Sequence, residues 1–333
     1  MSDPLLLAAF ALAAAVSLGA SWRLVVSLER VGARLGLSEA LLGLLAALAA
    51  DAPEITSAVT ALARHDQHVG AGVVIGSNVF NLAALLGLSS LIAGRIALHR
   101  RVLELSGALA LWISTAALLL IVGVLSAAAA LAAVLAGLLP YVWILAVRHE
   151  RLAALPIPAA WSRWLIAAVG EEELELEAAI HARRGGPRDA LVAVAAVAVV
   201  IAASVEMEHS GTQLGDRWGI SSIVVGALVL AVVTSLPNAV AAVYLAMRDR
   251  GAAVLSTSLN SNALNILAGL LIPTTALGAG APSGQTTYVA ACALAMTVLA
   301  LSCAYLQRGL RRSAGAVIIG AYLAFVCALV LGA

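Results

Sequence analysis

The stretches Asp51-Ala52-Pro53-Glu54 and Gly76-Ser77-Asn78-Val79-Phe80-Asn81 place polar residues inside otherwise apolar segments. A second pair, Ser235-Leu236-Pro237-Asn238 and Asn260-Ser261-Asn262-Ala263-Leu264-Asn265, repeats this pattern 184 residues later. In each half, 25 residues separate the proline from the first asparagine of the Ser-Asn-x-x-Asn element. Packing alone does not explain polar residues that recur at fixed spacing within apolar segments. The pattern indicates one site built twice, once from each half of a duplicated membrane protein.

The composition supports a membrane protein. Of 333 residues, 62% are hydrophobic and only 11% are charged, and the mean hydropathy is +1.03. Soluble domains carry about 25% charged residues. The net charge of +1 gives no reason to expect a nucleic-acid partner. The expected partners are therefore the lipid bilayer and, on the evidence of the acidic residues described below, inorganic cations. The sequence carries no signal for an oligomeric state.

Ten apolar segments are long enough to span a bilayer, which requires roughly 20 residues each. Their approximate cores are 5–28, 38–63, 69–93, 102–125, 127–147, 189–207, 219–247, 252–273, 286–306 and 314–332. The chain has no lysine, so all 19 basic residues are arginine. With the N-terminus outside, 17 arginines fall on the inner side and only Arg64 and Arg217 on the outer side. This excess predicts a multi-pass protein of the plasma (inner) membrane with both termini extracytoplasmic.

Each half contains five predicted spans, an odd number, so two copies must lie in opposite orientations. The predicted fold is an all-α membrane protein with about ten transmembrane helices in two inverted-topology five-helix repeats, an arrangement common in secondary transporters. Residues 1–148 form the first repeat, with its motif at 43–87, and residues 189–333 form the second, with its motif at 226–271. Residues 149–188 are predicted to be a cytoplasmic linker. Its acidic run at 171–177 is typical of a solvated segment, and an ion-sensing role is the alternative.

Two carboxylates lie deep in the second predicted span. Asp51 and Glu54 are three residues apart and would share one helix face. Carboxylates at membrane depth are costly and usually line an ion path. They could instead pair with a neighbouring helix, but no arginine lies deep in any predicted span to pair with them. We therefore predict that both are charged ligands of a cation.

Neutral oxygen atoms are expected to complete this site. Pro53 and Pro237 lack an N–H, which would free the backbone carbonyls of Ala49 and Val233 as ligands. Amide and hydroxyl oxygens also bind hard cations. The polar side chains of the two stretches would supply them: Ser77, Asn78, Asn81, Thr234, Ser235, Asn238, Ser261, Asn262 and Asn265. The alternative is that these residues only hydrogen-bond helices together.

The two stretches resemble the alpha-repeats of the cation/calcium exchanger superfamily, which includes sodium/calcium exchangers and proton-coupled calcium exchangers. The family motif is Gly-Thr-Ser-x-Pro-Glu followed by Gly-Ser-Asn-x-x-Asn or a close variant. Pro53, Glu54, Gly76, Ser77, Asn78 and Asn81 match it in the first repeat. Thr234, Ser235, Pro237, Ser261, Asn262 and Asn265 match it in the second. The resemblance implies an antiporter in which the first and sixth spans slide to switch access.

The chain departs from this motif in both repeats. Ala49-Ala50-Asp51 stands for Gly-Thr-Ser, Asn238 stands where the family has Glu, and Asn260 stands where it has Gly. One family carboxylate is therefore missing from the second repeat, and an additional one appears in the first. The formal charge of the site remains −2, which balances a divalent ion, but this charge is now one-sided.

These observations predict a secondary-active cation antiporter, resembling sodium/calcium exchangers, that exchanges Ca²⁺ for Na⁺ or H⁺ by alternating access. One alternative keeps the fold and changes the cargo to a monovalent cation with protons, or to another divalent cation. An alternative of another class is a non-transporting, ion-sensing membrane protein. An enzyme is not expected, because no loop carries a nucleophile with a base. No cofactor is expected beyond the transported ions.

Overall fold

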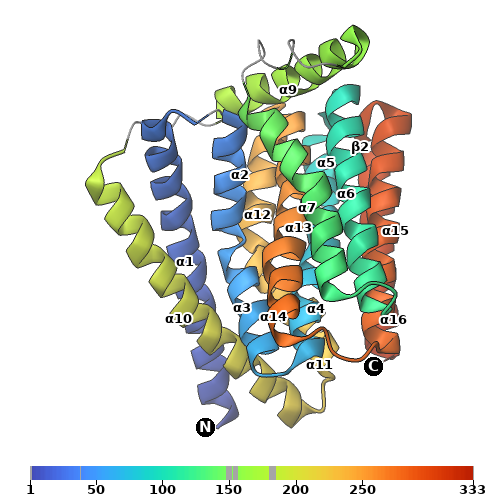
Figure 1. The fold of residues 1–333 in the computed structure, drawn as a ribbon. Helices are drawn as coiled ribbons and strands as arrows, with labels where there is room; N and C mark the ends of the chain where they lie inside the picture. Colours follow the sequence, from blue (N-terminus) through green and yellow to red (C-terminus); the bar gives the residue numbers. More distant parts are fainter. Residues whose placement is uncertain (1, 38, 148–151, 153–156, 180–184, 333) are drawn as a thin grey trace.

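The computed structural model describes residues 2–37, 39–147, 152, 157–179 and 185–332, without the side chains of 39–43, 171–179 and 252. It is a helical bundle (Figure 1). The first half contains α1 (Asp3–Leu35), α2 (Glu39–Ala50), α3 (Ala52–Ala63), α4 (Gln67–Asn81), η1 (Leu82–Leu88), α5 (Ser89–Ala93), α6 (Arg100–Ile121) and α7 (Ala127–Ala146). After α9 (Ala159–Ala179), the second half contains α10 (Pro187–Trp218), α11 (Ser222–Val224), η2 (Val225–Leu230), α12 (Ala231–Ala246), α13 (Gly251–Leu264), η3 (Asn265–Leu271), α14 (Ile272–Leu277), α15 (Gly284–Gln307) and α16 (Arg312–Leu331).

Eight helices in the described part of the chain are long and apolar enough to cross a membrane. The bent pair α2–α3 makes a ninth span if it is counted as one. The remaining predicted span, 252–273, is an unbroken helical run over Gly251–Leu277. This helix is less apolar than the other spans because its first half carries serines and asparagines, including Asn260, Ser261 and Asn262. About ten helices therefore pass along the bundle, as the sequence predicts.

The two halves correspond element by element. In chain order, α1 matches α10, α2–α3 matches α11–η2–α12, and α4–η1–α5 matches α13–η3–α14. The helices α6 and α7 match α15 and α16. The π-helices η1 and η3 both begin beside the last asparagine of the polar motif, at Leu82 and Asn265. The duplicated polar stretches thus lie on equivalent helices of two five-helix repeats.

One π-helix has no counterpart. Both α1 and α10 end at a left-handed glycine, Gly36 with φ 71° and Gly219 with φ 66°. From these glycines the chain takes 15 residues to reach Asp51 but 16 to reach the equivalent Ser235. A π-turn accommodates one extra residue within a helix. The helix η2 lies within the longer segment, so it accounts for the additional residue of the second repeat.

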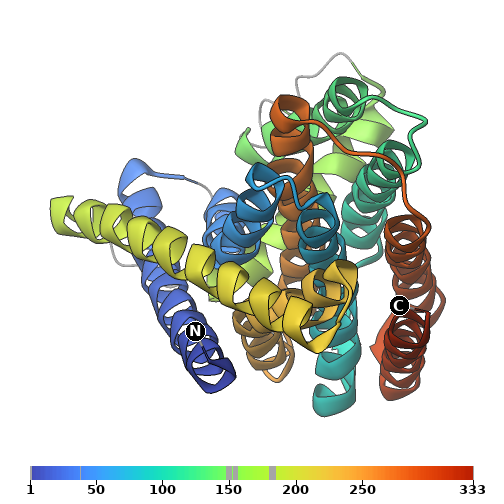
Figure 2. The same ribbon diagram turned by 90° about the horizontal axis from the view of Figure 1, so that it is seen from below.

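The long helices α1 and α10 lie side by side at one edge of the bundle. They cross each other, as Figure 2 shows from below, and α1 packs along α2 while α10 packs along α3. A small apolar cluster of Leu24, Ala49, Ala193 and Ala196 joins α1 and α10 to α2. The main apolar core lies elsewhere and includes residues from both repeats.

Close packing brings the two repeats together at the centre. A Cβ atom on Gly76 of α4 would lie 2.4 Å from the Cα atom of Ala227 in η2. A Cβ atom on Gly226 would lie 2.5 Å from the carbonyl oxygen of Val69. Only glycine permits helix backbones to approach this closely. These contacts bring the polar face of α4 against the second repeat.

The ends of the bundle differ. Both termini lie at one end, and α9 lies across the other (Figure 1). Of the predicted linker 149–188, the structure describes α9 and a few neighbouring residues, and the rest lies outside the described residues. Two three-residue strands, β1 (Arg95–Ala97) and β2 (Gly309–Arg311), pair antiparallel and are an addition to the predicted all-α fold.

Candidate functional site

The second span breaks at the predicted carboxylate pair. Helices α2 and α3 meet at an angle of 53°, and Asp51 stands between them. Pro53 is the cause, because it cannot donate to the carbonyl of Ala49 four residues earlier. Glu54 lies in the first turn of α3. The two carboxylates therefore lie at a helix break, and not on the face of one regular helix as their spacing suggested.

Both carboxylates contact the second repeat. Asn238 Nδ2 donates to Asp51 Oδ1 at 2.7 Å, and Ser261 Oγ donates to the same oxygen at 2.6 Å. Ser235 Oγ donates to Glu54 Oε1 at 2.9 Å. Asp51 is equivalent to Ser235, and Glu54 to Asn238. Each acidic residue of the first repeat thus meets a neutral donor at the other position of the second repeat.

The four motif asparagines form a pseudo-twofold arrangement. Asn78 Nδ2 donates to the carbonyl oxygen of Asn262 at 3.0 Å, and Asn262 Nδ2 donates to the carbonyl oxygen of Asn78 at 3.1 Å. Asn81 Nδ2 donates to Asn262 Oδ1 at 3.1 Å, and Asn265 Nδ2 reaches Asn78 Oδ1 at 3.5 Å. Asn81 Nδ2 also donates to Ser261 Oγ at 3.1 Å. The asparagines therefore clamp the two repeats together and reach the serine that binds Asp51.

The cluster is buried and contains more oxygen acceptors than hydrogen-bond donors reach. Every predicted ligand side chain is at most 6% exposed. Within the described part of the chain, four of their oxygen atoms are buried with no hydrogen-bond partner: Asp51 Oδ2, Glu54 Oε2, Asn81 Oδ1 and Asn265 Oδ1. Buried polar atoms are normally paired, and an unpaired one is costly. Carboxylate and amide oxygens of this kind are ligands that a hard cation takes.

The four remaining predicted ligands make no hydrogen bond to the two carboxylates in the described structure. Ser77 Oγ donates to Val73 O, and Thr234 Oγ1 donates to Leu230 O at 2.9 Å, so both hydroxyls bond within their own helices. The carbonyl oxygen of Ala49 accepts a hydrogen bond from Ser21 Oγ at 2.9 Å. Val233 lies in α12 one turn before Pro237, as its spacing requires. In this conformation Ser77 and Thr234 hold no partner across the repeat interface.

Several polar residues near the site were missed by the sequence analysis. Ser57, one turn after Glu54, and Ser258, one turn before Ser261, are buried and have unpaired hydroxyls in the described structure. Their helical spacing from predicted ligands was the available signal. Tyr141 of α7 donates to Asn260 Oδ1 at 3.3 Å, which gives this departure from the family motif a partner outside the site. Ser21 carried no signal, since its role depends on contact between helices.

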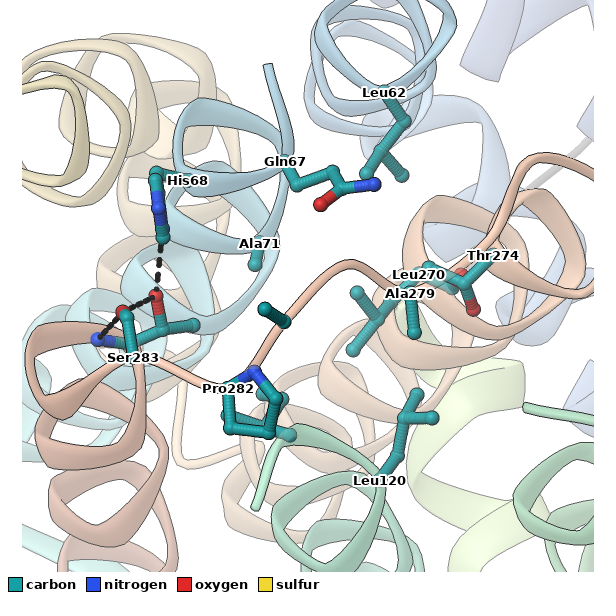
Figure 3. A pocket seen from close by; sticks show the side chains of 13 residues that line it. Leu62, Gln67, His68, Ala71, Leu120, Leu270, Thr274, Ala279, Pro282 and Ser283 are labelled. Atoms are coloured by element: carbon teal, nitrogen blue, oxygen red, sulfur yellow. Dashed lines mark hydrogen bonds between the residues drawn. The ribbon is translucent and has the colours of Figure 1, made fainter. Parts of the chain in front are cut away.

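A pocket elsewhere in the bundle is distinct from this cluster. It lies at the start of α4, beside the loop that joins α14 to α15 (Figure 3). His68 Nδ1 lies 3.1 Å from Thr286 Oγ1, which in turn lies 2.8 Å from Ser283 Oγ. None of the predicted ligands lines this pocket. In the described residues, no group of three or more His, Cys, Asp or Glu side chains could hold a metal ion. A cation beside Asp51 and Glu54 would therefore need amide or hydroxyl oxygens in addition to the two carboxylates.

The family model described as sodium/calcium exchanger protein matches residues 5–149 and 189–331. The chain belongs to this family. The match covers both repeats and leaves out 150–188, the region of the predicted linker. Membership confirms the resemblance drawn from the motifs and identifies the chain as a membrane exchanger of cations. No match was found among curated protein sequences.

Solved structures show the same fold for this exchanger. It is similar to the H⁺/Ca²⁺ exchanger CAX, with a TM-score of 0.70, 14% identity, and coverage of 98% of this chain and 86% of that one. The sodium-calcium exchanger NCX_Mj gives a TM-score of 0.59 and 19% identity, with 98% and 100% coverage. The structure called native YfkE gives 0.61 and 18%, with 97% and 92% coverage.

Proposed function

We propose that this protein is a secondary-active antiporter that exchanges Ca²⁺ for Na⁺ or H⁺ by alternating access. The observation that carries the proposal is the set of four buried, unpartnered oxygens of Asp51, Glu54, Asn81 and Asn265 at the junction of the repeats. Two of them belong to carboxylates, so the site supplies a formal charge of −2. This charge balances one divalent ion, two Na⁺ ions or two protons, as exchange at a single site requires.

The chemistry of the donors favours a hard cation. The cluster offers carboxylate, amide and hydroxyl oxygens, with no thiolate or imidazole among its members. Ca²⁺ takes six to eight oxygen ligands in flexible geometry, whereas transition metals favour nitrogen and sulfur. The structural relatives CAX and NCX_Mj are described as exchangers of Ca²⁺ against H⁺ and Na⁺. The flux experiment described below therefore examines both Na⁺ and H⁺ as counter-ions.

A monovalent cation/proton antiporter is the second candidate. Asp51 Oδ1 already accepts two hydrogen bonds, and both carboxylates belong to the first repeat. Fewer free charged oxygens, all on one side, favour a smaller charge on the cargo. This candidate uses the same residues and the same fold.

We also propose the orientation and location of the protein. Both termini lie at the end of the bundle opposite α9 (Figure 1), and Arg217 pairs with Asp3 of α1. The predicted spans put 17 of the 19 arginines on the same side of the membrane as the linker 149–188, which contains α9. The positive-inside rule then assigns α9 to the cytoplasm and both termini to the outside of the plasma membrane.

Flux in proteoliposomes tests this proposal. Na⁺ and pH gradients are imposed separately, and uptake of Ca²⁺ and of other divalent ions is followed. Ca²⁺ uptake driven by one gradient is the expected result. Na⁺/H⁺ exchange without movement of any divalent ion would replace the proposal by its monovalent alternative. Cation binding without any flux would contradict the antiport and favour a non-transporting, ion-sensing protein.

A further inference from the structure

A hydroxyl of α1 takes the place of a hydrogen bond that Pro53 removes. Ser21 is 1% exposed, and its Oγ donates to the carbonyl oxygen of Ala49 at 2.9 Å and lies 3.3 Å from that of Ala50. The carbonyl of Ala49 has lost its usual partner because Pro53 has no N–H. A buried carbonyl without a partner is costly. Ser21 therefore stabilises the broken helix beside Asp51 from outside that helix.

The second repeat has an equivalent serine that is used differently. Ser21 precedes the left-handed Gly36 by 15 residues, and Ser204 precedes the left-handed Gly219 by the same number. Pro237 deprives Val233 of its helical partner as Pro53 deprives Ala49. However, Ser204 Oγ lies 2.8 Å from Ser17 Oγ of α1, and both serines are fully buried. The two equivalent hydroxyls thus have different partners in one structure.

The packing of α1 and α10 has the same asymmetry. The helix α1 packs along α2, and α10 packs along α3, both in the first repeat. The matching contacts with the second repeat, α10 with η2 and α1 with α12, are less extensive. On α2 and α10 the surface between α1, α10 and α2 is built of short side chains, Ala49, Ala193 and Ala196, and α1 contributes Leu24. Short side chains interdigitate little, so they would oppose a shift of α1 and α10 along α2 only weakly.

We propose that Ser21 and Ser204 are alternating positioning residues of the exchange cycle. In the conformation described here Ser21 caps the Ala49 carbonyl and Ser204 is held by Ser17. In the oppositely facing conformation Ser204 caps the Val233 carbonyl and Ser21 is released. Inverted repeats supply the reason, because exchanging the conformations of the two repeats exchanges the side on which the site opens. This inference rests on the proposed antiport.

The test measures the balance between the two conformations. Protein of one orientation in proteoliposomes is assayed for the half-saturating Ca²⁺ concentration on each face, or that of Na⁺ if the parent moves only monovalent ions. Ser21→Ala is made in the parent and Ser204→Ala in a Ser17→Ala background, where Ser204 has no partner to lose in this conformation, so that each change removes one cap from one conformation. Loss of one buried hydrogen bond should change the ratio of the two concentrations about fivefold to tenfold. The two changes should shift the ratio in opposite directions, each relative to its own background, and combining them in the Ser17→Ala background should return the ratio toward that of Ser17→Ala.

Controls separate this role from a general effect on packing. Ser21→Thr keeps the hydroxyl and should keep the parent's ratio, whereas Ser21→Cys, a weaker donor, should give a smaller shift than Ser21→Ala. Ser210→Ala is the matched control, because Ser210 is buried on α10 and donates to Glu206 on the same helix at 2.9 Å. It should leave the ratio unchanged.

The outcomes distinguish a failure of the proposed antiport from a failure of the proposed alternation between Ser21 and Ser204. A parent protein without cation flux would overturn the proposed antiport, and this inference with it. If the parent exchanges ions but Ser21→Ala and Ser204→Ala shift the ratio in the same direction, or leave it unchanged, only the alternating caps are wrong.

Discussion

The contact between Asp51 and Asn238 joins a carboxylate of the first repeat to an amide of the second at 2.7 Å. The resemblance to calcium exchangers expects the opposite assignment here, a serine at 51 and a glutamate at 238. The structure thus places the additional carboxylate and the missing one at the same contact. This explains how the chain keeps a formal charge of −2 while departing from the motif at both positions.

Glu54→Gln should reduce exchange at least about 100-fold, because half of the site's charge is lost at a buried position where charge interactions are strong. The protein should remain folded, since the amide oxygen of Gln can still accept the hydrogen bond from Ser235 Oγ. Ion uptake in proteoliposomes and elution as a single species in detergent measure both effects. Glu104→Gln, at an exposed ion pair with Arg100, is the control and should transport normally. Parental activity in Glu54→Gln would show that the site lies elsewhere.

The double variant Asp51→Ser with Asn238→Glu tests whether the charge moved across one contact. Asp51→Ser alone lowers the site charge to −1 and should weaken divalent binding. Asn238→Glu alone places like charges at a 2.7 Å contact and should also impair uptake. The double variant restores both the family pattern and the charge, so it should bind Ca²⁺ at least as well as the parent.

Ca²⁺ binding and uptake by all four proteins complete a double-mutant cycle. Residues in direct contact show coupling of about 0.5–3 kcal/mol, whereas independent positions add. Additive losses in the double variant would mean that the two positions do not share one site.

Sequence reasoning reached the residues that form the buried polar cluster more readily than their geometry. The spacing of 184 residues indicated that Asn78 and Asn262 are equivalent, and the structure joins them by reciprocal hydrogen bonds. The break at Asp51 was not predicted, because helical spacing assumes a continuous helix. Ser77 and Thr234 carry ligand-type hydroxyls, yet both bond to their own helices, and only coordinates can distinguish these two uses.

At the scale of elements, the pair α1–α10 is tied to the second span at two depths. Ser21 holds the break between α2 and α3, and Arg64, at the end of α3, holds α10. Arg64 Nη1 donates to Glu208 Oε2 at 2.7 Å and lies 3.2 Å from His209 Nδ1. Side-chain hydrogen bonds therefore join α1 to the helix break and α10 to the far end of α3.

Arg64→Ala should destabilise the protein more than Glu208→Gln does. The side chain of Glu208 is only 2% exposed, so removing Arg64 leaves a buried carboxylate without its cation. We expect a cost of about 2 kcal/mol, below the range for fully buried pairs because Arg64 is 42% exposed. Thermal unfolding in detergent, at equal protein concentration, measures the difference.

Arg217→Ala provides the matched control for this ion pair. Arg217 Nη1 lies 2.7 Å from Asp3 Oδ1, and the two side chains are 40% and 44% exposed. Exposed pairs contribute about 0–1 kcal/mol, so this variant should unfold close to the parent's temperature. Equal losses in Arg64→Ala and Arg217→Ala would contradict the structural importance of the Arg64–Glu208 pair.

At the scale of the whole molecule, the duplicated plan was predictable because membrane spans and polar motifs leave strong periodic signals. Five spans in each half gave the inverted repeats, and the helices α6, α7, α15 and α16 occupy the predicted segments. The strands β1 and β2 gave no signal, since three residues are too short for a period-two pattern. The one-residue difference between the repeats was readable as spacing, but its accommodation by η2 required the structure.

The orientation of the bundle can be tested by labelling single cysteines from either side. Cys292, Cys303 and Cys327 are first replaced, and one cysteine is then introduced at Ala159 of α9 or at Asp216 of α10, both exposed. The helix α9 lies at the end of the bundle opposite the termini (Figure 1), and Asp216 is next to Arg217, which pairs with Asp3 at the start of α1. The distribution of 17 arginines against two predicts that only Asp216→Cys reacts with an impermeant thiol reagent in intact cells. Ala159→Cys should react only after the membrane is opened. Labelling of both from outside would contradict the inverted repeats, whereas exchange of the two patterns would keep the fold and reverse its orientation.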